Sequence, residues 1–188
     1  MRSNRLVPRS LLARAAAAVL VVVAAAATTT STAAAAPAPT GAATTLASLN
    51  EPFFRLYNPR TGDNYNTTDR AEVISQQANG YSYTGFDAFV STSPQAGLVP
   101  LYRLYSPQRR DRYHTASWDE VTAATSAQGY TYEGISAYAY PANSGSGVPF
   151  HRLRHPGNGD HVLMTNQAEV NSAVAAGYTY EGVAVNVN

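Results

Sequence analysis

Four side chains suited to metal binding lie close together in the last third of the chain. They are His151, His155, Asp160 and His161, and imidazoles combined with a carboxylate are typical zinc ligands. The chain repeats itself, however, and two earlier copies of the pattern hold other residue types in place of the three histidines. Those replacements are Phe54 and Tyr102, Asn58 and Ser106, and Asn64 and Arg112. Because the histidines follow no repeated requirement, we predict neither a metal site nor a cofactor.

Carboxylates form the second set of side chains that could carry out a reaction. Glycoside hydrolysis requires two carboxyl groups of different pKa on either side of one bond. Asp63, Asp111 and Asp160 recur in turns, and Glu133 and Glu181 follow the last strands of two copies, where the first copy has Thr84. A residue needed in every copy more often closes a turn than performs a reaction once. We therefore predict that the protein is not an enzyme.

Binding residues are the third set. Arg55, Arg103 and Arg152 recur in strands beside apolar residues, and we expect them to pair with the turn aspartates rather than with a ligand. Aromatic side chains are suited to stacking on sugars or anchoring a protein interface. The candidates for such contacts are Tyr83, Tyr132, Tyr180 and the single tryptophan, Trp118.

Three copies of one unit position these residues. Segments of 22 residues that begin at Pro52, Pro100 and Pro149 align without a gap, and the strand arginines follow at offsets of 48 and 49 residues. Each copy ends in a glycine-tyrosine motif, such as GYTYEG at Gly129. Internal repetition at this period indicates a repeat architecture.

Each copy predicts a β-β-α-β unit. Alternating apolar and aromatic residues indicate a strand, and Leu56, Leu104 and Leu153 recur on its expected buried face. A proline- and glycine-containing turn then leads into a second strand, although the second copy has Arg110 where the others have glycine, which indicates a strained or differently built turn.

A helix follows the second strand in every copy. Asp69, Ser117 and Asn166 each precede a glutamate by three residues, which predicts capping boxes with the glutamates as caps. The helices end at Gly80, Gly129 and Gly177, where glycine suits the left-handed position after a helix. The first and last copies are as regular as the middle one, whereas open solenoids need atypical end repeats. We therefore expect an α+β fold of three repeats, 51–97, 98–147 and 148–188, closed into a pseudo-threefold ring.

Composition excludes several partner classes. The chain has no cysteine, which rules out disulfides and thiolate chemistry. All thirteen basic residues are arginines, and four of them precede residue 15. Without those four, nine arginines face twelve acids, a balance that argues against nucleic acid or membrane-surface binding.

The N-terminus predicts export. Arginines without acids, the apolar run 15–27 and the small residues up to Ala36 have the pattern of a signal peptide over residues 1–36. Residues 37–50 then form an extended tail with no expected core contact. Leu46 and Leu49 in this tail are candidates for binding a partner protein, and the alternative is that the tail is a passive spacer. The folded domain is expected at 51–188.

The repeated motifs resemble a known family. Arg103-Leu104-Tyr105, Asp111 and the GYTYEG motif at Gly129 are similar to a repeat family of unknown function in secreted bacterial and fungal proteins. That family often accompanies hydrolases or other exported domains, which implies an accessory binding role. In size and layout the chain is also similar to the small connector subunit of the umbrella-shaped toxin particles of streptomycetes. This second resemblance implies a lectin-bearing subunit and a large toxin subunit as partners.

Three hypotheses follow for the function. The first is a secreted adaptor in an extracellular protein assembly, the second is a lectin-like carbohydrate-binding module, and the third is a glycoside hydrolase. An adaptor should have one face unlike the others, whereas a lectin should repeat the same aromatic and polar pocket in each unit.

Overall fold

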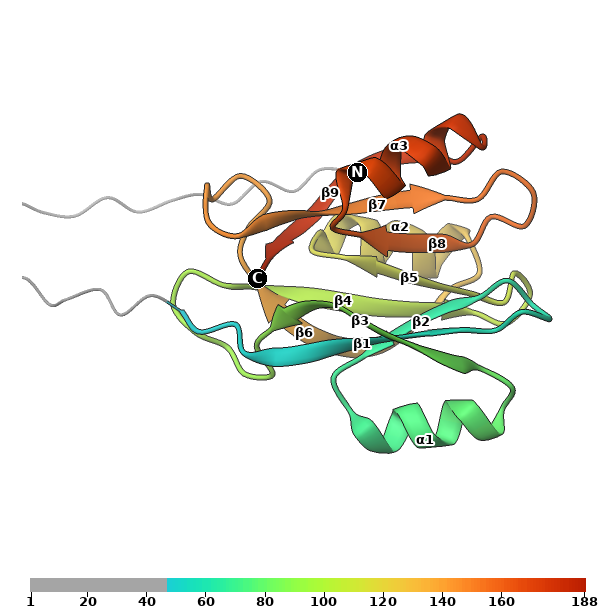
Figure 1. Ribbon diagram of the computed structural model, residues 1–188, viewed down its shortest axis with the longest axis horizontal. Helices are drawn as coiled ribbons and strands as arrows, with labels where there is room; N and C mark the ends of the chain where they lie inside the picture. Colours follow the sequence, from blue (N-terminus) through green and yellow to red (C-terminus); the bar gives the residue numbers. More distant parts are fainter. Residues whose placement is uncertain (1–46) are drawn as a thin grey trace, which may run out of the picture. The chain divides into compact units, whose positions relative to one another are not determined.

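The computed structural model describes residues 47–188, which contain three successive copies of one unit (Figure 1). The order of two strands, one helix and a third strand is the predicted one in all three copies. Unit 1 consists of β1 (Glu51–Tyr57), β2 (Asn64–Thr67), α1 (Arg70–Ala78) and β3 (Ser82–Val90). Unit 2 consists of β4 (Val99–Ser106), β5 (Asp111–Thr115), α2 (Trp118–Ala127) and β6 (Thr131–Ala139). Unit 3 consists of β7 (Val148–Arg154), β8 (His161–Met164), α3 (Gln167–Ala175) and β9 (Thr179–Val187).

Each unit forms its own three-stranded antiparallel sheet with its first strand in the centre. The strand orders are β2-β1-β3, β5-β4-β6 and β8-β7-β9. The register between the first and third strands shifts twice in every unit, and in unit 2 the shifts fall at Leu101/Tyr102 and Arg103/Leu104. Such bulges increase the local twist of a strand. The three sheets are therefore irregular at the same places, beside the strand arginine.

The hairpin turns explain the glycines of the repeat. Gly62 and Gly159 have φ angles of 80° and 78°, which glycine adopts without strain. Arg110 occupies the same place in unit 2 with a φ of 55° and is the one non-glycine residue with positive φ in residues 47–188. The unit 2 turn therefore has the same conformation as the others, with a strained arginine in place of glycine.

The helices begin and end at the predicted residues. Asp69, Ser117 and Asn166 are the N-caps, and the side-chain oxygen of Ser117 accepts a hydrogen bond of 3.3 Å from the Glu120 backbone N–H. Gly80, Gly129 and Gly177 follow the helices with positive φ. The backbone N–H of Ser117 donates to the hydroxyl oxygen of Thr115 at 3.0 Å and not to Glu120. The predicted return bond of the capping box, from the glutamate side chain to the N-cap backbone, is therefore absent in unit 2.

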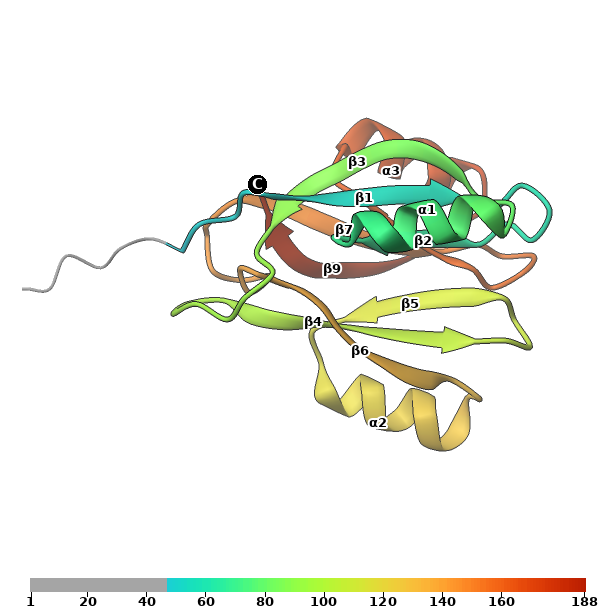
Figure 2. The same cartoon turned by 90° about the horizontal axis from the view of Figure 1, so that it is seen from below.

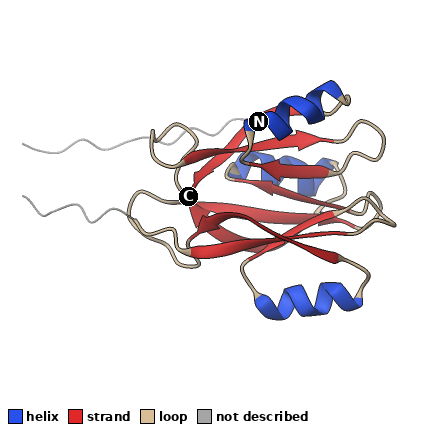
Figure 3. Ribbon diagram, viewed as in Figure 1, coloured by secondary structure: helices blue, strands red, loops and turns tan. Residues whose placement is uncertain are grey.

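A central core lies between the three sheets, and the helices lie outside them (Figures 1 and 3). Phe53, Leu101 and Phe150, one from each central strand, are fully buried in this core. On the opposite side of the central strands, Leu104 and Leu153 pack under α2 and α3 in two smaller clusters. Figure 2 shows α2 outside the sheet of unit 2. The predicted apolar face with Leu104 and Leu153 is therefore buried, and the opposite face of the same strands is buried as well.

Backbone contacts connect the three units in pairs. Ser91 bridges to Tyr138, and Tyr140 bridges to Asn186. Phe89 exchanges backbone hydrogen bonds of 2.6 and 3.2 Å with Asn188. Units 1 and 2, units 2 and 3, and units 1 and 3 thus each have a backbone link at the ends of their third strands, which gives the molecule a threefold arrangement.

Residues 47–50 pack on the domain, which corrects the expectation that the tail up to Asn50 makes no core contact. Leu49 is 6 % exposed, the Tyr140 hydroxyl donates to the Ala47 carbonyl at 2.7 Å, and Ser48 is bonded to the Gln95 side chain. The reason is that Leu49 is large enough to bury apolar surface where the strand ends meet. The predicted signal peptide, residues 37–46 and Leu46 lie outside the described residues. Within residues 47–188, no helix has both the length and the apolar character needed to cross a membrane.

Candidate functional site

The three turn aspartates meet at the centre of the molecule. Oxygen atoms of Asp63, Asp111 and Asp160 lie within 4.8 Å of one another, and all three side chains are buried. Asp111 is the first residue of β5, and Asp63 and Asp160 immediately precede β2 and β8, so the repeated hairpin places the three at equivalent points.

Each aspartate accepts hydrogen bonds from the following unit. The donor in every case is the residue next to that unit's own turn aspartate, through both its backbone N–H and its side chain. The pairs are Asp63 with Arg112 at 3.2 and 2.7 Å, Asp111 with His161 at 2.8 and 2.7 Å, and Asp160 with Asn64 at 3.2 and 2.7 Å. Tyr81 and Tyr130 donate further bonds to Asp63 and Asp111. The aspartates thus act as internal acceptors that join the units in cyclic order.

Burial changes the charge state of this cluster. Desolvation, reinforced by the other aspartates, raises the pKa of Asp160 to about 8. Desolvation also raises the pKa of Asp63 to about 6, against the lowering effect of Tyr81 and Arg112. Hydrogen bonds to Asp111 and Glu181 outweigh desolvation at His161 and raise its pKa to about 9. At neutral pH Asp160 therefore holds a proton, and His161 is an imidazolium.

The strand arginines form a second set of contacts between units. Arg103 donates to both carboxylate oxygens of Glu72 in unit 1 at 2.9 Å, and its Nε lies 2.8 Å from Glu133 of its own unit. Arg152 contacts Glu120 of unit 2 at 2.9 and 3.1 Å and Glu181 of its own unit at 2.9 Å. The expected pairing of these two arginines with the turn aspartates is wrong. Their guanidinium groups instead bond the helix glutamates of the preceding unit.

These glutamates are the functional residues whose role the sequence reasoning missed. Glu72 and Glu120 were expected to cap their own helices, but their side chains turn away from the N-caps toward the next unit. Hydrogen bonding from Arg103 lowers the pKa of Glu72 to about 2. Burial acts to raise the pKa of Glu120, but bonds from Arg152, Thr115 and Tyr113 outweigh this effect and lower the pKa to about 2. The signal was present in the sequence, since arginine and glutamate recur together in all three copies.

Unit 1 departs from this pattern in an informative way. Thr84 stands where the other units have Glu133 and Glu181, so Arg55 lacks that carboxylate. Asp87, three residues later, lies 3.5 Å from Arg55 and accepts a 3.1 Å bond from Asn66. In unit 1 the carboxylate that contacts the strand arginine therefore lies three positions later in the third strand than in units 2 and 3.

The three candidate histidines do not converge. His151 lies 3.0 Å from the Tyr180 hydroxyl, and His155 accepts bonds from Gly157 and Asn158 within its own turn. Only His161 approaches an aspartate, and that aspartate is Asp111 of unit 2 rather than Asp160 of its own turn. The three histidines, which are close together in the sequence, therefore make three separate contacts in the structure.

The aromatic candidates gather on the outer face of each unit, between the helix and the third strand. In unit 2, Trp118 is 54 % exposed and packs edge-on against Tyr102 and Tyr132, with ring centroids 5.2 and 5.6 Å away. We call Tyr102, Trp118 and Tyr132 the unit 2 face. Its three rings leave a wide aromatic surface open to a partner.

The equivalent faces of units 1 and 3 differ from it. Unit 1 carries Phe54 and Tyr83, with the Arg70 guanidinium 5.1 Å from the Phe54 ring centroid and Ile74 70 % exposed beside them. Unit 3 carries His151 and Tyr180, with Val174 exposed nearby. A tyrosine is therefore common to the three faces, and its neighbours are not.

The sequence-predicted binding residues fall into three groups. Tyr83, Tyr132, Tyr180 and Trp118 lie on the outer faces, where a partner can reach them. Arg103 and Arg152 are mostly buried in contacts between units, and Arg55 is partly buried beside Asp87. Leu49 is part of the folded domain.

Comparison with known proteins gives one match. A family model described as a domain of unknown function, DUF5648, matches residues 52–188. No curated protein and no solved structure matches the chain.

Proposed function

Because this chain belongs to the family described as a domain of unknown function, DUF5648, which assigns no activity, we propose from the geometry that it is a secreted, non-catalytic adaptor that binds other exported proteins. Its three units close into a ring, and the unit 2 face is the main protein contact. The partners we expect are those of an extracellular assembly, with a lectin-bearing subunit and a large toxin subunit as the specific expectation.

The difference between the three outer faces carries this proposal. Equivalent positions hold Trp118 in unit 2, Arg70 in unit 1 and Gln167 in unit 3. Exposed tryptophan and tyrosine are the residues most enriched among those that dominate binding energy at protein interfaces. A protein that bound one ligand three times would keep the same neighbours around its tyrosine. One face unlike the others fits the binding of distinct partners.

Two observations support the other parts of the proposal. The backbone links between each pair of units support ring closure, since no unit has a free third-strand end. Of the carboxylates considered for glycoside hydrolysis, the three turn aspartates accept bonds that join the units. Glu133 and Glu181 are held by arginines of their own units, and this engagement of all five groups supports a non-catalytic role.

Quantitative capture of partner proteins tests the proposed adaptor function. The tagged exported form, with residues 37–188, is used to capture proteins from the culture medium of its own source, beside the variants Trp118→Ala and Ile74→Ala. We expect a defined partner at fixed stoichiometry, lost at least tenfold with Trp118→Ala and retained with Ile74→Ala, which removes a comparably exposed apolar side chain from unit 1. The absence of a stoichiometric partner, or equal capture by Trp118→Ala, would overturn the proposal.

A lectin-like role is the second candidate, and the recurrence of Tyr83, Tyr132 and Tyr180 at equivalent exposed places favours it. These side chains are 45 %, 38 % and 45 % exposed. Titration with neutral oligosaccharides separates the two candidates, because a lectin should bind about three equivalents and lose one with each Tyr→Ala variant. An adaptor should show no saturable uptake of these sugars.

A further inference from the structure

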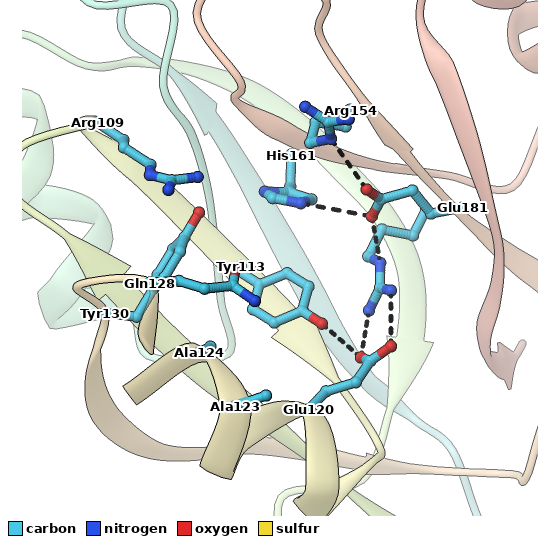
Figure 4. Close-up of a pocket in the computed structure, with 11 residues that line it drawn as sticks. Arg109, Tyr113, Glu120, Ala123, Ala124, Gln128, Tyr130, Arg154, His161 and Glu181 are labelled. Atoms are coloured by element: carbon cyan, nitrogen blue, oxygen red, sulfur yellow. Dashed lines mark hydrogen bonds and ion pairs between the residues drawn. The ribbon is translucent and has the colours of Figure 1, made fainter. Parts of the chain in front are cut away.

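A polar cavity of about 320 Å³ opens between units 2 and 3 (Figure 4). The surface of α2 forms one side through Ala123, Ala124 and Gln128, and unit 3 contributes Arg154, His161 and Glu181. The remaining wall comes from Arg109, Tyr113, Glu120, Tyr130 and Arg152. This volume lies at the lower end of the range of about 300–1,000 Å³ for small-molecule sites.

The same place between units 1 and 2 is filled. There Tyr105 stands where unit 3 has Arg154, and Arg112 stands where unit 3 has His161. The Arg112 guanidinium lies 4.4 Å from the ring centroid of Tyr65 and 4.2 Å from that of Tyr105. The α1 residues that correspond to Ala123 and Ala124 are the larger Ser75 and Gln76. Four positions that line the cavity therefore hold smaller or differently charged residues than their equivalents between units 1 and 2 or, at Arg154, an arginine in place of a tyrosine.

The lining has an excess of positive charge. Arg109, Arg152, Arg154 and the imidazolium of His161 face two carboxylates, Glu120 and Glu181. Glu120 is bonded by Arg152, Tyr113 and Thr115. Glu181 is bonded by Arg152 and Arg154 and lies 3.4 Å from His161. The buried Asp111 behind His161 reduces the excess but does not cancel it.

Arg109 is the cation with the most freedom to bind a ligand. Its guanidinium lies over the ring of Tyr130 at 5.6 Å from the centroid, and among residues 47–188 it forms no ion pair. Arg154 is 44 % exposed and uses its Nε for Glu181, which leaves its two terminal nitrogens without a partner in the described residues. Two guanidinium groups therefore have donors available for an anion.

We propose that this cavity binds a ligand of monosaccharide size that carries hydroxyl groups and one anionic group. Arg109 and Arg154 hold the anionic group. The amide of Gln128 and the hydroxyl of Tyr113 bond the sugar hydroxyls, and the apolar methyl groups of Ala123 and Ala124 contact the ring. Both a carboxylate, as in a uronic acid, and a phosphate, as in a sugar phosphate, have this chemistry. The site is distinct from the outer aromatic faces and does not depend on the proposed adaptor function.

Calorimetric titration of the purified exported form with four compounds tests the site. The compounds are glucuronate, glucose 6-phosphate, glucose and inorganic phosphate. We expect one equivalent of glucuronate or glucose 6-phosphate to bind with a Kd below about 1 mM, and the stronger of the two identifies the anion. Glucose and inorganic phosphate should bind at least tenfold more weakly. Failure of both acidic sugars to bind, or equal binding of inorganic phosphate, would overturn the proposal.

Three variants locate the binding. Arg154→Tyr introduces the residue that unit 2 carries at this place and should abolish binding by filling the cavity, and Arg109→Ala should weaken binding at least tenfold. Arg60→Ala removes an exposed arginine from the turn of unit 1 and is the charge-matched control. Thermal melts show that each variant is folded, and Arg109→Lys provides a conservative second test if Arg109→Ala is unstable. Unchanged binding by both Arg109→Ala and Arg154→Tyr contradicts the proposal, whereas Trp118→Ala should bind the sugar normally even if the adaptor function fails.

Discussion

Arg103 of unit 2 holds Glu72 of unit 1 by two hydrogen bonds of 2.9 Å, one to each carboxylate oxygen. The contact crosses from one unit to the next and is repeated between Arg152 and Glu120. Paired hydrogen bonds of this kind fix both distance and orientation. These two arginine–glutamate pairs therefore help to fix the relative placement of neighbouring units, together with the aspartate bonds and the backbone bridges.

Glu72→Gln should reduce the free energy of unfolding by about 2 kcal/mol. Breaking a buried ion pair costs about 3–5 kcal/mol, and the Glu72 side chain is one third exposed, which reduces the effect. Glu169→Gln changes the equivalent residue of unit 3, which forms no ion pair in the described part of the chain, and should change stability by less than about 0.5 kcal/mol. Urea unfolding of both variants measures the difference, and equal effects would contradict the assigned role of Glu72.

Asp87→Ser should destabilise the protein by about 1–2 kcal/mol, because Arg55 and Asn66 lose their shared acceptor. Ser136 is the unit 2 residue at this place. Adding Thr84→Glu to the same variant restores the acid position of units 2 and 3 and should recover most of the loss. Thermal melts of the single and double variants test this prediction. A double variant less stable than Asp87→Ser would show that the two positions do not substitute for each other.

Arg110→Gly should stabilise the domain by about 0.5–1 kcal/mol. The substitution removes the strain of a non-glycine residue at positive φ, about 1–2 kcal/mol, and part of the gain is offset by the greater entropy of glycine in the unfolded chain. Gly159→Ala is the converse change, since a methyl group there meets no atom within 4 Å and only the φ of 78° opposes it. It should destabilise by about 1 kcal/mol. The two variants should shift the melting temperature in opposite directions.

Stability should be highest at weakly acidic pH. His161 has a raised pKa, so its contribution is complete below its ordinary value of 6.5 and is lost as the pH rises through about 9. The pKa of Asp160 is raised from 3.8 to about 8, so between these values the native state holds a proton that the unfolded state has lost, and stability falls as the pH rises from about 4 to about 8. Glu72 and Glu120 have lowered pKa values, and their contribution is lost as the pH falls from 4.5 toward about 2.

The measurement is a series of thermal melts from pH 3 to pH 10. Asp160→Asn keeps the shape of the protonated side chain and removes its ionisation, so the variant should lose less stability than the unchanged protein between about pH 4 and about pH 8. A parallel decline of the two proteins over that range would mean that Asp160 does not titrate there.

Leu49→Ala should destabilise the domain by about 2 kcal/mol, the usual effect of removing a buried leucine side chain at a partly adaptable site. Deleting residues 37–46 tests the separate proposal that they contact a partner. We expect this deletion to leave the melting temperature unchanged and to reduce partner capture at least tenfold, or about 1.4 kcal/mol. Full capture by the truncated protein would assign recognition to the three units alone.

Local features of the fold could be predicted from the sequence because nearby residues determine them. The N-cap of Ser117, the helix end at Gly129 and the strained turn at Arg110 all depend on residues within one unit. The burial of Leu104 under α2 follows from strand alternation.

Contacts between units could not be predicted in the same way. The distance from Glu72 to Arg103 spans 31 residues, and nothing in local propensity distinguishes a capping glutamate from one that pairs with the next unit. The cavity beside Arg154 arises only when the third unit lies against α2. In the sequence Leu49 is part of the N-terminal tail, and nothing near it indicates burial. Its packing depends on the other end of the chain, where the Asn188 side-chain nitrogen lies 3.5 Å from the Leu49 carbonyl oxygen.

The proximity of Leu49 and Asn188 has a consequence for how the chain can be connected. The two ends of the described domain lie side by side, and the unit contacts follow a cyclic order in which Asp160 of unit 3 accepts hydrogen bonds from Asn64 of unit 1. A circular permutant that joins Asn188 to Ala47 by a short linker and opens between Ala96 and Gly97 would retain the aspartate contacts between units and the burial of Leu49. The order 1-2-3 is therefore one of three cyclic orders of the units that these contacts allow.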